Sequence, residues 1–506
     1  MPRKYVEKIL RARVYDVATE SPLELAARLS SRLNNRILLK REDTQAIFSF
    51  KLRGAYNKIF GLGETAKSKG VVAASAGNHA QGVALACKRL QVSATIVMPT
   101  TTPAIKVDTV RSLGAKAILL GDSYDEANAH ALQLAEAQGL SFIHPFDDPE
   151  VIAGQGTIGM EILRQHADPI SAVFVPVGGG GLIAGVAAYI KHVRPDIKVI
   201  GVEPEDAPTL HSALQAGRRV RLKKVGLFAD GVAVRQIGKE TFRVARHLVD
   251  EVVLVNTDQI CAAIKDIYDD TRSVAEPAGA LAVAGIKQYL TQHPQQDKTL
   301  VAILSGANIN FDRLRHVVER TEIGEQREAL LAVEIPEKPG SFLRFCRLLG
   351  KRGITEFNYR YADAQRAQIF CGVELREGAE ERAALLQRLQ DKGYAVVDLT
   401  DNETAKMHIR HMVGGHAPQA MDECLYRFVF PERPGALLDF LAGLTRGWNI
   451  SLFHYRNHGA AYGRVLVGLQ LTPGARRDFE QFMKNKQYHY VDETDNPAYR
   501  LFASSG

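Results

Sequence analysis

The sequence predicts an α/β chain with parallel sheets, followed by two copies of a smaller α+β module. Up to residue 320, short β-branched runs alternate with alanine-rich helical stretches, and this alternation is typical of βαβ units. Beyond residue 320, two segments of similar sequence follow each other. A chain of 506 residues has room for about three domains.

The first 320 residues contain apolar runs of strand length separated by segments with helical periodicity. The predicted strands are Val71–Ala76, Ala94–Pro99, Lys116–Gly121, Ala172–Val177, Lys198–Glu203 and Thr299–Ser305. The predicted helices are Gly82–Leu90, Pro103–Leu113, Tyr124–Gln138 and Leu182–Val193. Parallel sheets bind ligands beyond the carboxyl ends of their strands. We therefore expect a ligand site there, where two glycine-containing loops follow strands.

A charged stretch over residues 311–330 marks a change of pattern, and we interpret it as a connecting helix or linker. The domains predicted around it are residues 1–320, 321–400 and 422–506, with residues 401–421 as a second linker.

The C-terminal part is an internal repeat with an offset of about 95 residues. Glu337–Gly340 returns as Glu432–Gly435, and Ile354–Arg360 returns as Ile450–Arg456. Each copy reads strand, helix, strand, strand, helix, strand, which is the order of the ferredoxin-like split βαβ fold. In the first copy these elements are Leu330–Ile335, Phe342–Lys351, Ile354–Tyr361, Gln368–Leu375, Glu380–Gln390 and Tyr394–Leu399.

Lys51 is the first candidate for chemistry. It lies between Phe50 and Leu52 at a predicted helix start. Burial disfavours a charged amine and lowers its pKa. A neutral lysine can form a Schiff base with an aldehyde. The alternative is an ordinary surface lysine, which the two loops described next argue against.

The loop Gly178–Gly181 follows a predicted strand and precedes a predicted helix. Glycines let the backbone approach a phosphate, and a helix start offers free N–H groups. A dinucleotide site is the alternative, because Glu203 stands about 20 residues later, but the GxGxxG spacing fits poorly. Otherwise we interpret Glu203 as part of a solvated acidic loop.

A polar turn formed by Ser75, Gly77, Asn78 and His79 follows the first predicted strand. The start of the next helix can bind a carboxylate through its dipole and free N–H groups. His79 has an alternative interpretation as a capping or packed histidine. Ser305 ends the last predicted strand of the α/β part.

The segment SFKLRGA around Lys51, the loop SAGNHAQG from Ser75 to Gly82 and the GGGG loop together resemble the pyridoxal-phosphate enzymes of the tryptophan synthase β-like fold. Within that group the chain resembles the biosynthetic threonine deaminases. The C-terminal repeat resembles the ACT-type regulatory domains that bind amino acids. The resemblance implies two parallel-sheet α/β subdomains followed by an ACT-like tandem.

The resemblance also implies roles for the candidate residues. Lys51 forms the Schiff base with pyridoxal 5'-phosphate and later removes the α-proton. The remaining cofactor-binding residues implied are Phe50, Asn78, Gly178, Gly179, Gly180, Gly181, Leu182 and Ser305. The substrate carboxylate is expected on the turn Ser75, Gly77, Asn78 and His79. A hydroxyl at the pyridine nitrogen, from Ser305, should leave that nitrogen neutral and favour loss of a β-leaving group.

The implied reaction converts L-threonine to 2-oxobutyrate and ammonia, the first step of isoleucine biosynthesis, with L-serine as a poorer substrate. The repeat implies inhibition by isoleucine, with valine as a candidate activator. The expected effector contacts are Tyr359, Arg360, Tyr455 and Arg456. The alternative is that these tyrosines pack the strand ends and the arginines face solvent. A cytoplasmic homotetramer is also implied.

Other functions stay open at this point. Serine dehydratase or serine racemase activity would use the same scaffold. A non-catalytic amino-acid sensor would use the repeat alone, and a nucleotide-binding oxidoreductase would rest only on Gly178–Gly181 and Glu203. A net charge of +7 without a basic patch carrying interleaved aromatics argues against nucleic-acid binding. No apolar run is long enough to predict a membrane span, and five scattered cysteines predict a reduced compartment and no metal site.

Overall fold

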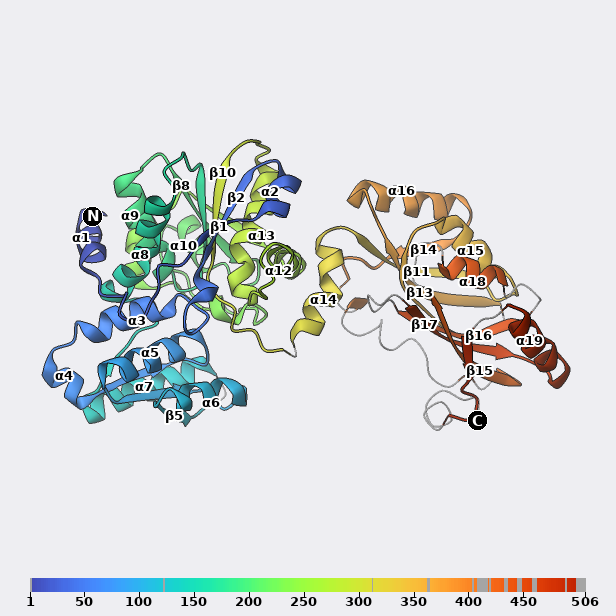
Figure 1. Cartoon of the computed structure of the whole chain (residues 1–506), viewed down its shortest axis with the longest axis horizontal. Coiled ribbons are helices and arrows are strands. Elements are labelled where there is room, and N and C mark those ends of the chain that lie inside the picture. Colours follow the sequence, from blue (N-terminus) through green and yellow to red (C-terminus); the bar gives the residue numbers. More distant parts are fainter. Residues whose placement is uncertain are drawn as a thin grey trace. The chain divides into compact units, whose positions relative to one another are not determined.

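The computed structural model describes residues 2–121, 123–311, 313–361, 365–402, 405–406, 417, 420–431, 436–443, 448–456, 462–486 and 489–496. The chain divides into two compact units, Met1–Gly324 and Glu325–Gly506 (Figure 1). Among the described residues the strands form three sheets, which we call the large and small sheets of the first unit and the C-terminal sheet of the second. None of the described helices combines the length and the apolar character needed to cross a membrane.

The large sheet has the strand order β1-β2-β10-β7-β8-β9. All neighbouring strands are parallel except β1, which pairs with β2 in the antiparallel sense. The strands are β1 (Leu23–Leu25), β2 (Arg36–Arg41), β7 (Ala172–Pro176), β8 (Lys198–Pro204), β9 (Glu251–Val255) and β10 (Thr299–Leu304).

Helices cover both faces of the large sheet (Figure 1). Val173 and Val175 pack in the same cluster as α8 (Pro149–Gln165) and α9 (Gly181–Val193). Phe174, on the opposite side of β7, packs with residues of α12 (Thr257–Thr271) and α13 (Pro277–Gln292). A strand buried on both faces reads as a continuous apolar run, which is why the sequence predicted this strand.

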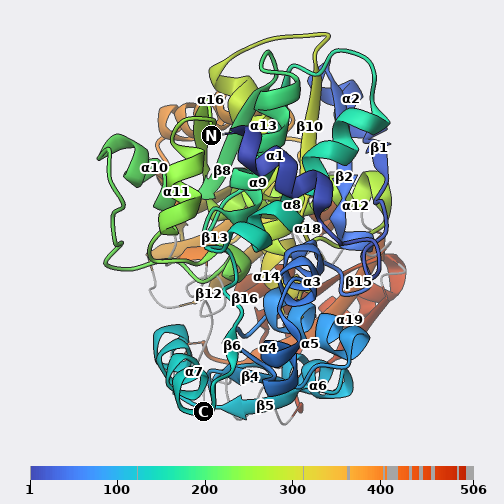
Figure 2. The same cartoon turned by 90° about the vertical axis from the view of Figure 1, so that its left-hand side faces the viewer.

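The small sheet has the order β5-β4-β3-β6, and all of its pairs are parallel. Its strands are β3 (Val71–Ala74), β4 (Ala94–Met98), β5 (Lys116–Leu119) and β6 (Ser141–Phe142). Figure 2 shows α5, α6 and α7 grouped with these strands, apart from α8 and α9. These helices are α5 (Asn78–Leu90), α6 (Ala104–Ser112) and α7 (Tyr124–Gln138).

The other elements of the first unit support these two layers. They are α1 (Pro2–Arg11), α2 (Ala27–Leu33), η1 (Glu42–Thr44), α3 (Lys51–Phe60), α4 (Glu64–Lys69), α10 (Thr209–Gln215), η2 (Asp230–Val232), α11 (Lys239–Ala245) and α14 (Arg313–Gly324). The helix α14 lies in the charged stretch, but part of it is buried against the rest of the first unit. Its Arg320 is buried and forms an ion pair with Asp258 of α12 at 2.9 Å.

The predicted parallel-sheet fold is confirmed, and each predicted strand of the first unit is present within two residues of its expected ends. One helix begins earlier than expected, at Asn78 instead of Gly82. Gly82 does not break the helix. A Cβ atom at Gly82 would lie 3.1 Å from the main chain of Lys51, so this glycine lets α5 approach α3 closely.

The C-terminal sheet has the order β14-β11-β13-β12-β16-β17-β15-β18 and is antiparallel (Figure 1). The first copy comprises β11 (Glu328–Pro336), α15 (Ser341–Leu349), β12 (Ile354–Arg360), β13 (Arg366–Glu374), α16 (Gly378–Asp391) and β14 (Ala395–Asp398). The second comprises β15 (Glu423–Pro431), α18 (Ala436–Gly443), β16 (Asn449–Arg456), β17 (Tyr462–Gln470), α19 (Pro473–Lys486) and β18 (His489–Asp492). Both copies have the predicted order of elements. The predicted limits between the domains stay predictions.

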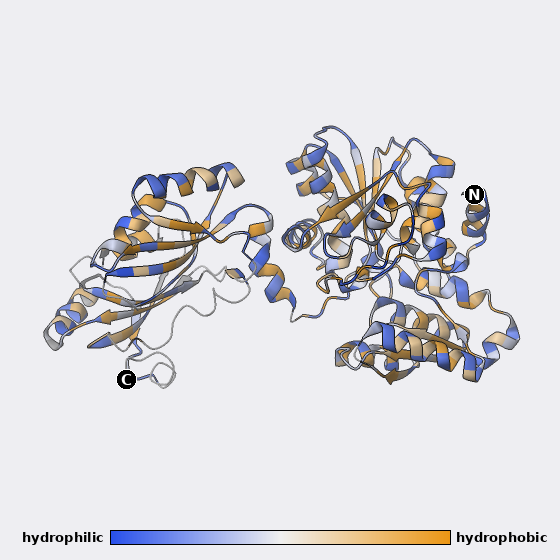
Figure 3. Cartoon of the chain, turned by 180° about the vertical axis from the view of Figure 1, so that it is seen from behind, coloured by the Kyte–Doolittle hydropathy of each residue, from blue (hydrophilic) through white to orange (hydrophobic). Residues whose placement is uncertain are grey.

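The two copies join through β12 and β16, with Asn358 opposite His454. On either side of this pair, Phe357 faces Tyr455 and Tyr359 faces Phe453. The offset of the repeat makes Tyr359 the equivalent of Tyr455, so the contact has a local two-fold symmetry centred on Asn358 and His454. In Figure 3 the strands of the sheets are largely hydrophobic and the helices carry hydrophilic residues on their outer sides.

Candidate functional site

A cavity of about 1010 Å³ lies at the carboxyl ends of β3, β7 and β10 in the first unit. Every residue predicted for the cofactor or the substrate lines it. These residues are Phe50, Lys51, Ser75, Gly77, Asn78, His79, Gly178, Gly179, Gly180, Gly181, Leu182 and Ser305. The structure therefore brings together segments that lie up to 255 residues apart in the sequence.

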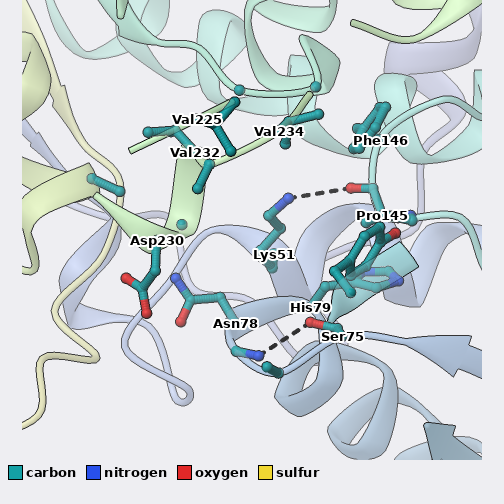
Figure 4. Close-up of a pocket in the computed structure, with 18 of the residues that line it drawn as sticks. Lys51, Ser75, Asn78, His79, Pro145, Phe146, Val225, Asp230, Val232 and Val234 are labelled. Atoms are coloured by element: carbon teal, nitrogen blue, oxygen red, sulfur yellow. Dashed lines mark hydrogen bonds between the residues drawn. The ribbon is translucent and has the colours of Figure 1, made fainter. Parts of the chain in front are cut away.

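Lys51 is the first residue of α3, and its amine points into the pocket toward Pro145 (Figure 4). Its Nζ donates a hydrogen bond to the main-chain oxygen of Pro145 at 3.2 Å and lies 5.2 Å from the ring centroid of Phe50. Burial lowers the pKa of Lys51 to about 8, against the opposing effect of the negative charge of Glu276. This amine loses its proton more readily than an exposed lysine does.

The glycine loop lies between β7 and α9 in close contact with its neighbours. A Cβ atom on Gly179 would lie 2.2 Å from the ring of Phe146, and one on Gly178 would lie 2.8 Å from Cα of Val232. Gly180 has a φ of +88°, a conformation that L side chains rarely adopt. No larger residue fits these three positions without a shift of the surroundings.

The loop turns its carbonyl groups to threonine side chains. The hydroxyl groups of Thr209 and Thr241 donate to the main-chain oxygens of Gly178 and Gly179, each at 2.8 Å. The first amides of α9 have no partner within the helix, and Gly181 and Leu182 line the cavity. Free N–H groups at a helix start bind phosphate, so this cradle fits a phosphate group.

The turn Ser75–His79 lies between β3 and α5, on another side of the cavity (Figure 4). The main-chain N–H of Gly77 donates to Oγ of Ser75 at 3.2 Å. Because α5 begins at Asn78, its first amides lie in this turn and can bind a carboxylate.

The side chain of His79 is packed, as its alternative interpretation proposed. It is buried, and its Nε2 lies 2.9 Å from the main-chain oxygen of Ile143. A carbonyl oxygen only accepts, so Nε2 carries the hydrogen. Burial, and next the positive charge of Lys51, lower the pKa of His79 to about 3. The predicted contact of His79 with the substrate can therefore be made by its main-chain N–H, not by its imidazole.

Ser305 follows β10 and is buried, and its hydroxyl donates to the main-chain oxygen of Ala278 at 3.4 Å. The bond is long, and a hydroxyl hydrogen can rotate to another acceptor in the cavity. Asn308 also lines the cavity. Its Nδ2 donates to Oδ1 of Asn78 at 2.7 Å, so it acts through Asn78.

The interpretation of Glu203 as part of a solvated acidic loop is wrong. Its carboxylate is fully buried and accepts from Leu210 N at 2.8 Å and His211 N at 2.9 Å, and its Oε1 lies 2.9 Å from Oγ1 of Thr209. Burial raises the pKa of Glu203 to about 7. Glu203 does not line the described cavity, so the oxidoreductase alternative loses its acidic residue at the site.

The predicted effector residues lie in the strands β12 and β16 that join the two copies. Tyr359 is buried, donates its hydroxyl hydrogen to Glu337 and packs against Phe342. Tyr455 is buried as well. The side chain of Arg456 lies outside the described part of the chain.

Arg360 is buried and bound to the second copy. Its guanidinium pairs with Glu423 of β15, where Nη2 and Oε2 are 3.0 Å apart, and it donates to the main-chain oxygen of Ser451 at 3.1 Å. The interpretation of Arg360 as a solvent-facing residue is therefore wrong. An effector that uses this guanidinium must compete with Glu423 for it.

Glu276 is a polar residue of the cavity that the sequence analysis missed. It lies directly before α13, and its Oε1 accepts from Nδ2 of Asn78 at 2.6 Å. Burial, and next the negative charge of Asp230, raise the pKa of Glu276 to about 7. The available signal was an acidic residue immediately before Pro277 at a helix start, a pattern that many exposed helix caps share.

Two family models match the chain. Residues 14–306 match the pyridoxal-phosphate dependent enzymes, and residues 319–409 and 414–503 match the C-terminal regulatory domain of threonine dehydratase. The chain is 59% identical over 503 residues to a biosynthetic L-threonine dehydratase of Burkholderia multivorans, covering 99% of each chain. It is 56% identical over 499 residues to the corresponding enzyme of Escherichia coli, covering 99% of this chain and 97% of that one.

Solved structures resemble the first unit. Threonine deaminase isoform 2 of Solanum lycopersicum is 55% identical, with a TM-score of 0.62 over 63% of this chain and 92% of that one. Maize serine racemase is 32% identical, with a TM-score of 0.59 over 62% of this chain and 96% of that one.

Proposed function

The chain belongs to the pyridoxal-phosphate dependent enzymes that carry the C-terminal regulatory domain of threonine dehydratase, and on that premise we propose that it converts L-threonine to 2-oxobutyrate and ammonia. The observation that carries the proposal is Lys51, a buried lysine at a helix start that shares one cavity with a phosphate cradle and a carboxylate-binding turn. The names of the full-length relatives support the choice of threonine.

The residues of the cavity fit pyridoxal phosphate at each of its polar ends. The amine of Lys51 matches the aldehyde, the amides from Gly178 to Leu182 match the phosphate, Asn78 matches the phenolic oxygen and Ser305 matches the pyridine nitrogen. When bound, the cofactor supplies an electron sink for the charge left by the departing α-proton. The neutral hydroxyl of Ser305, in place of a carboxylate, favours elimination over transamination.

Lys51 is the proposed base of the reaction. With a pKa of about 8, about a tenth of its amine is unprotonated at pH 7 and can accept the α-proton of threonine. The first amides of α5 hold the substrate carboxylate on the turn Ser75–His79. This fixes the amino acid at its carboxylate end while Lys51 removes the α-proton.

The single most direct test is 2-oxobutyrate formation from L-threonine, with and without isoleucine. We expect turnover with threonine and slower turnover with L-serine, because one methyl group in a pocket discriminates by about 10–200-fold. No 2-oxobutyrate from threonine would contradict the proposal.

Serine dehydratase or serine racemase activity is the second candidate, and the likeness of the first unit to maize serine racemase favours keeping it. The two are separated by their products. Racemisation yields D-serine, whereas dehydration yields pyruvate from serine. If kcat/KM were higher for either serine reaction than for threonine dehydration, the serine activity would become the preferred function.

For regulation, we propose that isoleucine binds at the joined strands β12 and β16 and lowers turnover. Tyr359, Tyr455 and Arg360 are the described candidates, and Arg360 would exchange Glu423 for the carboxylate of the amino acid. That exchange would loosen one ion pair between the copies, which gives the two states that regulation requires. Valine as an activator, a homotetramer and a cytoplasmic location are further proposals from the family resemblance.

A further inference from the structure

Glu276 is an acidic side chain that lines the cavity and belongs neither to the proposed cofactor contacts nor to the carboxylate-binding turn. It is 5% exposed and lies at the start of α13. Its carboxylate accepts a hydrogen bond from Nδ2 of Asn78, which lies 2.6 Å from its Oε1, and another from the main-chain N–H of Asn308. Glu276 therefore contacts a residue of the proposed cofactor site through the nitrogen of that residue's amide.

Asn308 binds the opposite side of the same amide. Its Nδ2 donates to Oδ1 of Asn78 at 2.7 Å and to the main-chain oxygen of Ile47 at 2.8 Å. An amide nitrogen carries two hydrogens, so these two acceptors use both hydrogens of Asn308 Nδ2. The side of Asn78 that faces Asn308 must therefore be its oxygen.

Glu276 determines the other side of Asn78. A carboxylate only accepts hydrogen bonds, and a protonated carboxyl group still keeps an accepting oxygen. Asp230, Lys106 and Lys51 are the further charged groups that interact with Glu276. Asp230 raises and Lys106 lowers the pKa of Glu276, and the negative charge of Glu276 raises the pKa of Lys51. In either protonation state Glu276 can accept from Nδ2 of Asn78, whose second hydrogen remains available to an acceptor in the cavity.

We propose that Glu276 is a positioning residue that holds the amide of Asn78 in one orientation, so that Asn78 presents an N–H group to the phenolic oxygen of pyridoxal phosphate. The inference deepens the proposed function and rests on it. A reversed amide would set the oxygen of Asn78 against the oxygens of Glu276 and of the cofactor. One hydrogen bond lost in this way weakens binding by about tenfold.

The test measures the dissociation constant of pyridoxal phosphate, not turnover. The full-length protein is freed of cofactor and titrated with pyridoxal phosphate, and the Schiff-base absorption band is recorded for wild type, Glu276→Leu and Glu276→Gln. The leucine removes the acceptor at similar volume, whereas the glutamine keeps an accepting oxygen without the charge. We expect Glu276→Leu to raise the dissociation constant about tenfold and to shift the band, and Glu276→Gln to stay within about threefold of wild type.

A second variant approaches the amide from the opposite side. Asn308→Asp replaces the donor by an acceptor and should turn the amide of Asn78 around, with a loss of affinity similar to that of Glu276→Leu. Asp266→Leu is the matched control. It removes another buried carboxylate. Asp266 lies on α12, does not line the cavity, and pairs with Arg32 and Lys287. This variant should lower the thermal midpoint of the apoprotein and leave cofactor affinity unchanged.

Wild-type affinity and an unchanged band in both Glu276→Leu and Asn308→Asp would overturn the inference. So would a loss in Glu276→Gln equal to that in Glu276→Leu, because charge and not orientation would then be the contribution of Glu276. If Glu276→Leu does not fold, Asn308→Asp decides alone, and wild-type affinity with an unchanged band in that variant would overturn the inference. A wild-type protein that binds no pyridoxal phosphate would refute the proposed function itself, which separates the two failures.

Discussion

Arg53 and Glu42 form a buried pair in which two guanidinium nitrogens each donate to a carboxylate oxygen at 2.8 Å. Neither side chain is exposed. Arg53 lies two residues after Lys51 on α3, and Glu42 follows β2, so the pair ties the lysine-bearing helix to the large sheet. Glu161 of α8 accepts from the same guanidinium at 2.5 and 3.0 Å.

Replacement of Arg53 by methionine should destabilise the first unit strongly. The variant keeps much of the buried volume but leaves Glu42 and Glu161 without their main cation, and removing one partner from a buried pair costs about 3–5 kcal/mol. Urea unfolding followed by circular dichroism measures the loss. Arg194→Gln, in an exposed pair with Asp196, is the control and should leave the midpoint in place. Equal midpoints for Arg53→Met and wild type would contradict the expectation.

Lys51→Ala should lower kcat for threonine by at least about 100-fold, because it removes the proposed base and the group that binds the cofactor aldehyde. The measurement is 2-oxobutyrate release, repeated with a small primary amine that should restore part of the rate. Lys58→Ala is the matched control on the same helix, since Lys58 pairs with Asp148 outside the cavity lining. Normal turnover of Lys51→Ala without added amine would remove Lys51 from the mechanism.

Gly179→Ala should weaken binding of pyridoxal phosphate by more than about tenfold, because the new methyl group overlaps the ring of Phe146 and displaces the cradle. Equilibrium dialysis with the cofactor gives the dissociation constant. Gly63→Ala is the comparison, since a Cβ atom there meets nothing within 4 Å. If both variants bind the cofactor as wild type does, the close contact at Gly179 does not shape the site.

His79 should make the protein sensitive to acid. Its pKa is about 3 in the folded protein and about 6.5 when unfolded, so between these values the unfolded chain binds the extra proton. Stability therefore falls as the pH falls below 6.5, by about 2 kcal/mol at pH 5. His79→Gln can still donate to Ile143 and should lose less stability than wild type between pH 7.5 and 5. Urea unfolding at both pH values checks this, with exposed His192→Gln as the control whose acid response should match wild type.

Tyr455→Ala should raise the isoleucine concentration needed for half-inhibition and leave turnover without isoleucine close to wild type. The reason is that Tyr455 lies in the β12–β16 contact proposed to bind the effector. Tyr394→Ala provides the comparison, because Tyr394 packs against Phe345 next to the edge strand β14, away from that contact. Unchanged inhibition of Tyr455→Ala would remove this residue from the effector site.

The fold was predictable where strands are buried on both faces, because runs such as Ala172–Val177 are continuously apolar. The start of α5 was not, because Gly82 looks like a helix breaker until its contact with the main chain of Lys51 is seen. A glycine that serves close packing and a glycine that ends a helix are the same letter in a sequence. Only the position of the neighbouring helix distinguishes them.

The site was predictable where one residue type can do one job, as with Lys51 and the glycine loop. The partners of charged side chains were not. Glu203 looked solvated beside acidic neighbours, but it is buried in β8 and accepts hydrogen bonds from amides in the first turn of α10. Arg360 looked free to bind a ligand, but its carboxylate partner Glu423 lies in the other copy. Long-range pairing of this kind depends on the register between the copies, which no local pattern encodes.

The symmetric contact between β12 and β16 has a consequence for solubility. Each copy presents the same kind of strand edge to the other, so the contact is self-complementary in the way that an isologous dimer contact is. In the intact chain each edge is covered by its counterpart. Two copies that came apart would uncover both edges, and open edges recruit further strands. Joining the copies in one polypeptide therefore protects the protein against edge-to-edge aggregation.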